Sequence, residues 1–87
     1  MKKIKFCKHA ELKLQILKKH GINFTKPQIE EVVSAPDKII EAEKSRRIAQ
    51  KIINTQYLIR VIFEESKDSI IVITFYPARR SRYEDKL

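Results

Sequence analysis

The alternation of apolar and polar residues divides the chain into seven segments of regular structure. Apolar residues three and four positions apart indicate helices, and residues that alternate between apolar and polar indicate strands. We predict helices at 8–20 and 26–35 and strands at 4–6, 38–42, 47–54, 57–65 and 69–76. This order predicts an α+β fold, in which two N-terminal helices pack on one face of a twisted antiparallel sheet of four to five strands.

Both predicted helices carry end signals. Thr25 and Gln28 are spaced as a capping box at the start of the second helix. Gly21 stands where a glycine commonly closes a helix, immediately after the first. On that first helix His9, Lys13 and His20 fall between two apolar groups. We therefore expect these three polar side chains to face inward or toward a cleft rather than open water.

The two longest strands each have one wholly apolar face, which we expect to pack on the helices. These faces carry Ile59, Val61 and Phe63 on one strand and Ile71, Ile73 and Phe75 on the other. The opposite faces bring Arg60, Thr74 and Tyr76 together on neighbouring strands, with Lys51 as their neighbour on a third strand.

An arginine in the middle of a strand is costly unless it is paired. Two readings of Arg60 follow from this. It forms a salt bridge with an acid such as Glu43 or Glu64, or it binds phosphate on a concave sheet face. The strand pattern alone leaves both open.

Composition indicates one folded domain over residues 1–87, with a basic C-terminal tail at 78–87. Of the 87 residues, 43% are hydrophobic and 34% are charged, which is typical of a folded protein. The net charge of +8 favours a polyanionic or acidic partner. The lone Cys7 can form no internal disulfide, and no apolar run is long enough for a leader or a membrane span. We therefore expect a cytoplasmic protein without membrane contact.

The end of the chain concentrates arginine and tyrosine. Its residues are Tyr76, Arg79, Arg80, Arg82 and Tyr83. Arginine suits phosphate, and tyrosine offers a flat face on which a base can stack. This stretch is either a nucleic-acid contact or a solvated basic tail.

Three stretches resemble the family catalogued as domain of unknown function 4258. They are residues 6–14 with Gly21-Ile22, residues 29–33 with Pro36-Asp37, and a closing hairpin at 58–64 and 71–76. The similarity runs from about Lys5 to Tyr83. That family looks related to the RelE/ParE-like and BrnT-like toxins of toxin–antitoxin systems.

The resemblance implies a RelE-like fold and a toxin-type activity. Toxins of this fold are commonly metal-independent endoribonucleases, which cleave RNA through attack by the 2′-hydroxyl, whereas ParE-like members inhibit gyrase by protein–protein contact. An acidic antitoxin would then be a second partner besides RNA. The chain departs from the family at Lys13, where an arginine is expected after the histidine. A lysine offers a point charge instead of a bidentate fork.

Metal-free RNA cleavage needs a base, cations that stabilise the phosphorane, and an acid. We assign His9 as the base, Arg60 and Arg79 as the phosphate-stabilising cations, and Tyr76 as proton donor or stacking group. The additional nucleic-acid-binding residues are Lys13, Lys51, Thr74, Arg80, Arg82 and Tyr83. The spacing of Cys7, His9 and His20 matches no metal-ligand pattern, so neither a metal nor a cofactor is expected.

Two alternatives to catalysis stay open. His9 could simply bond nearby backbone at the helix start. The same basic surface could then hold nucleic acid or an acidic antitoxin without chemistry. The second alternative is a ParE-like inhibitor that acts through protein contact.

Overall fold

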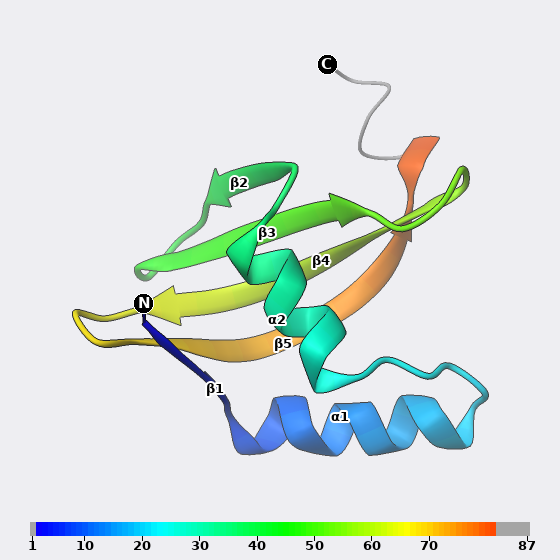
Figure 1. Cartoon of the computed structure of the whole chain (residues 1–87), viewed down its shortest axis with the longest axis horizontal. Helices are drawn as coiled ribbons and strands as arrows, with labels where there is room; N and C mark the ends of the chain where they lie inside the picture. The colour runs from blue at the N-terminus through cyan, green and yellow to red at the C-terminus, as the bar shows by residue number, and fades with distance from the viewer. Residues whose placement is uncertain (1, 82–87) are drawn as a thin grey trace.

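A computed structural model describes residues 2–81 as one five-stranded sheet with two helices (Figure 1). The elements are β1 (Lys3–Phe6), α1 (Lys8–Lys19), α2 (Lys26–Ser34), β2 (Lys38–Glu41), β3 (Arg46–Ile52), β4 (Tyr57–Glu65) and β5 (Ser69–Arg79). The α+β class and the order of the elements are therefore confirmed. The last strand continues three residues beyond its predicted end, through Pro77 to Arg79.

The sheet is mixed, not antiparallel as predicted. Its strand order is β1-β5-β4-β3-β2, so the first strand lies beside the last. The pair β1–β5 is parallel, and the other three pairs are antiparallel. The local alternation of β1 predicts a strand but carries no information about its partner, which is why its direction was missed.

The two helices lie at different places around the sheet and contribute to one core. Helix α2 crosses one face over β3 and β4, whereas α1 lies along the sheet edge beside β5 (Figure 1). The buried core lies between them. It contains Ala10 of α1, the α2 residues Ile29, Val32 and Val33, and the sheet residues Ala49, Ile59, Val61, Phe63, Val72 and Phe75.

Both predicted helix ends are confirmed. The Gln28 backbone N–H donates to Thr25 Oγ1 at 3.3 Å, and the Thr25 backbone N–H donates to Gln28 Oε1 at 2.9 Å. Gly21 has a φ of +82°, the left-handed conformation that glycine adopts without steric cost.

A β-bulge divides β5 into two halves. Thr74 pairs with Ile62, but Val72 pairs with Phe63, so Ile73 is the extra residue. The bulge reverses the facing of the first half of the strand. Phe75 is in the core as predicted, whereas the core residue of the first half is Val72 and not Ile71, which pairs instead with Glu64.

Candidate nucleic-acid interface

Two cations converge on one tyrosine on the sheet face opposite α2. We call this the far face; no described helix packs across it (Figure 1). Arg60 Nη1 donates to the Tyr76 hydroxyl at 3.1 Å, and the guanidinium carbon lies 5.9 Å from the ring centroid. Lys13 Nζ lies 5.8 Å from the same ring and donates to Thr74 Oγ1 at 3.2 Å. We call these four residues the Tyr76 cluster.

Three elements position this cluster. Arg60 of β4 and Tyr76 of β5 are register partners, so their side chains leave the sheet on the same side. Thr74 stands two residues before Tyr76 and shares that side. Lys13 reaches the cluster from α1, which lies along the edge of β5. The predicted meeting of Arg60, Thr74 and Tyr76 is therefore confirmed.

Burial gives the two cations different roles. Arg60 is only 9% exposed, so its charge lies beneath the surface, and from there the guanidinium donates a hydrogen bond to the Tyr76 hydroxyl. Lys13 is half-buried, and this burial lowers the pKa of its amine below the usual value. Lys13 therefore releases its proton more readily than a surface lysine.

The prediction that both histidines face a cleft was wrong. His9 and His20 are exposed, and only Lys13 of the three predicted residues turns toward the sheet. His9 lies one helical turn before Lys13, and no described contact joins it to Arg60 or Tyr76.

The arginines of the chain end form a separate site. Arg79 pairs with Tyr57 at the end of β5, and with Arg80 it lines a hollow of about 370 Å³. Arg80 is anchored there, since Nη1 donates to the Asn54 carbonyl at 3.2 Å and the backbone N–H donates to the Gln56 carbonyl at 2.8 Å. Arg79 is therefore not part of the Tyr76 cluster, contrary to the prediction. The predicted contacts Arg82 and Tyr83 lie outside the described residues.

Lys51 was assigned to the wrong face. It pairs with Ile59 on the helix-covered side, and its Nζ donates to the Ala35 carbonyl at 2.7 Å. The residue beside Arg60 on β3 is Gln50. Sequence reasoning missed Gln50 because a shift of one residue in strand pairing exchanges the two faces of a strand.

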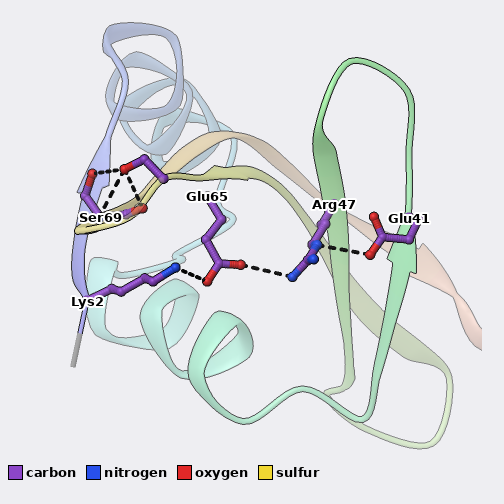
Figure 2. Close-up of polar contacts among 6 residues, drawn as sticks. Lys2, Glu41, Arg47, Glu65 and Ser69 are labelled. Carbon is purple, nitrogen blue, oxygen red and sulfur yellow. Dashed lines mark hydrogen bonds and ion pairs between the residues drawn. The ribbon is translucent and has the colours of Figure 1, made fainter.

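The opposite end of the sheet is occupied by an ion-pair network (Figure 2). Glu65 joins Lys2 at 2.5 Å and Arg47 at 3.0 Å, and Arg47 also joins Glu41 at 3.0 Å. The hydrogen bond from Lys2, assisted by the charges of Lys2 and Arg47, lowers the pKa of Glu65. Since the acids compensate these cations, this end is less suited to a polyanion than the far face.

Other sites are limited in the described part of the chain. No group of three or more histidine, cysteine, aspartate or glutamate residues within 2–81 could hold a metal ion. Over the same residues, none of the helices has the length and apolar character that crossing a bilayer requires. An apolar hollow of about 150 Å³ lies between Phe24, Val32 and Ile59 on the α2 side.

Comparison with known proteins adds no relative. No protein-family model matches the chain, no curated protein matches its sequence, and no solved structure matches its fold. The functional argument therefore depends on the geometry of the far face and on the chemistry of its side chains.

Proposed function

We propose that this protein binds single-stranded RNA on the far face, with the Tyr76 cluster as the phosphate-binding centre. The observation that carries the proposal is the convergence of Lys13 and Arg60 on Tyr76. A phosphate beside the Tyr76 hydroxyl would experience both charges and could accept hydrogen bonds from Lys13 and from the phenol. The net charge of +8 would draw a polyanion toward this surface.

RNA is the polyanion that the resemblance to the RelE-like toxins implies. The order of helices and strands is compatible with a RelE-like fold, and we propose on this basis that the chain adopts that fold. The Arg79 hollow at the end of β5 offers a further cationic contact on the same polymer. Binding of an acidic antitoxin and ParE-like inhibition by protein–protein contact stay predictions.

Binding can be tested by fluorescence anisotropy with a labelled single-stranded RNA, in the presence of a chelator. Tyr76→Phe removes only the hydroxyl, and we expect it to weaken binding about tenfold, because hydrogen bonds to a charged partner contribute about 1.5–3 kcal/mol. The matched control is Lys67→Gln in the β4–β5 turn, which removes one exposed charge at the far end of β5. Equal binding by wild type and Tyr76→Phe, or no RNA binding at all, would contradict the proposal.

A second function, metal-independent cleavage of the bound RNA, is favoured by Lys13. Its lowered pKa makes the neutral amine more available as a general base, and the neighbouring Tyr76 could serve as acid. Arg60 would stabilise the developing charge on the phosphate. In this arrangement Lys13 replaces His9 as the proposed base. Products with 2′,3′-cyclic phosphate ends, formed by wild type in the presence of a chelator and absent with Lys13→Met, would support cleavage. If the RNA stays intact, the cleavage function is refuted and only the binding function remains.

A further inference from the structure

A row of polar side chains crosses the far face from β2 to β5. Register pairs Lys38 with Gln50, Gln50 with Arg60, and Arg60 with Tyr76. We call these four residues the polar row. Neighbouring strands lie about 4.8 Å apart, so the row spans about 14 Å, and Lys13 extends it beyond Tyr76. An apolar row of Ile40, Ile48 and Ile62 lies beside it.

Gln50 is the unusual member of the polar row. It is only 7% exposed, and its Oε1 atom accepts no hydrogen bond from any residue in the described range 2–81. Buried side-chain oxygens are nearly always paired, because an unpaired one loses its water without replacement. A methionine or leucine would fill this strand position without that cost. A ligand that donates a hydrogen bond to Oε1 would explain the glutamine, and the side chain must turn outward to meet it because the atom is covered in the free protein.

We propose that Gln50 selects the base of the bound RNA, and that the RNA strand runs across the sheet along the polar row. This inference depends on the RNA-binding function proposed above. A glutamine amide presents an acceptor and a donor side by side, which matches the N6 amino group and N7 of adenine. Adenine is therefore the preferred base beside Gln50, with phosphates toward Tyr76 and Lys13 on one side and toward the exposed Lys38 on the other.

The first test compares short labelled homopolymers of A, C and U against the wild-type protein. We expect the A polymer to bind about tenfold more tightly, which corresponds to about 1.4 kcal/mol. This comparison needs no variant, so it does not depend on how a substitution folds. Equal affinity for the three polymers would overturn the selection of adenine while leaving RNA binding intact. Absence of binding to any polymer would overturn the function and the inference together.

The second test uses Gln50→Met, which keeps the length of the side chain but removes the amide. The variant should bind all three polymers with the affinity that wild type shows for the weaker ones. Retained preference for A would show that another group reads the base. Lys38→Gln should weaken binding of every polymer to a similar extent, and Lys67→Gln again serves as the control for a lost surface charge. An unchanged affinity of Lys38→Gln would refute the path across the sheet.

Discussion

Replacing Lys13 with methionine separates the role of this residue in folding from its role in binding. The change removes a hydrogen bond to Thr74, worth about 1 kcal/mol, and cation–π contacts with Phe75 and Tyr76, worth about 0.5–1 kcal/mol each at exposed sites. It also removes the cost of taking the charged amine partly out of water, which is the cause of the lowered pKa. These effects oppose each other, and we expect the free energy of unfolding at neutral pH to change by about 1 kcal/mol or less.

The burial of Lys13 also predicts the direction in which the free energy of unfolding changes with pH. In the unfolded chain Lys13 holds its proton up to its ordinary pKa of 10.5, whereas the folded protein releases it at a lower pH. Between those two pKa values the unfolded state binds more protons, so the free energy of unfolding rises with pH in that window. Urea unfolding of wild type from neutral pH to pH 10.5 should show this rise, and Lys13→Met should lack that component. Parallel curves for the two proteins would refute the burial of a charged amine at this position.

Lys13→Met should affect RNA binding more strongly than it affects the free energy of unfolding. Each phosphate contact with a single strand contributes about 0.7 to the slope of log K against log salt concentration. Anisotropy titrations over a range of salt concentrations should therefore give Lys13→Met a slope lower by about 0.7 than that of wild type. A slope that is unchanged, with binding otherwise intact, would remove Lys13 from the phosphate-binding centre.

Two further predictions concern the interior. Gln50→Met should raise the free energy of unfolding by about 1 kcal/mol, because a buried carbonyl without a donor costs about 1–3 kcal/mol; a lower urea midpoint would contradict this. Phe75 is fully buried and packs edge to face against Phe24, with 5.9 Å between the two ring centroids. Phe75→Ala should lower the free energy of unfolding by about 3–5 kcal/mol, whereas a loss below about 1 kcal/mol would mean that the core refills the space.

The secondary structure could be predicted because its signals are local. The capping box of Thr25 and Gln28 and the left-handed Gly21 each depend on a few neighbouring residues, and both are present in the structure. The pairing of β1 with β5 joins residues more than sixty positions apart, such as Ile4 and Ile70. Alternation within a strand does not specify such a partner, so the mixed sheet lay beyond sequence reasoning.

The members of the candidate site could be predicted only within the hairpin of β4 and β5, where alternation along regularly paired strands determines which side chains share a face. Arg60 and Tyr76 both lie on the turn-distal side of the bulge, where β4 and β5 pair regularly, so alternation placed them correctly. Gln50 and Lys51 are adjacent, and only the pairing between β3 and β4 decides which of them faces Arg60. Arg79 was grouped with Tyr76 because both belong to one sequence cluster, yet the two residues are three positions apart along the strand, a distance of about 10 Å.

One irregularity links the core to the candidate site. At the bulge the carbonyl of Ile73 accepts a hydrogen bond from Cys7 Sγ at 3.2 Å, and the carbonyl of Val72 accepts one from the Cys7 backbone N–H at 3.0 Å. Cys7 is also the residue before α1, so the bulge holds the start of the helix against β5. From that position the second turn of α1 brings Lys13 to Thr74. The same bulge that turns Val72 into the core therefore lies where α1 is joined to β5, and the alignment of Lys13 with Tyr76 depends on that junction.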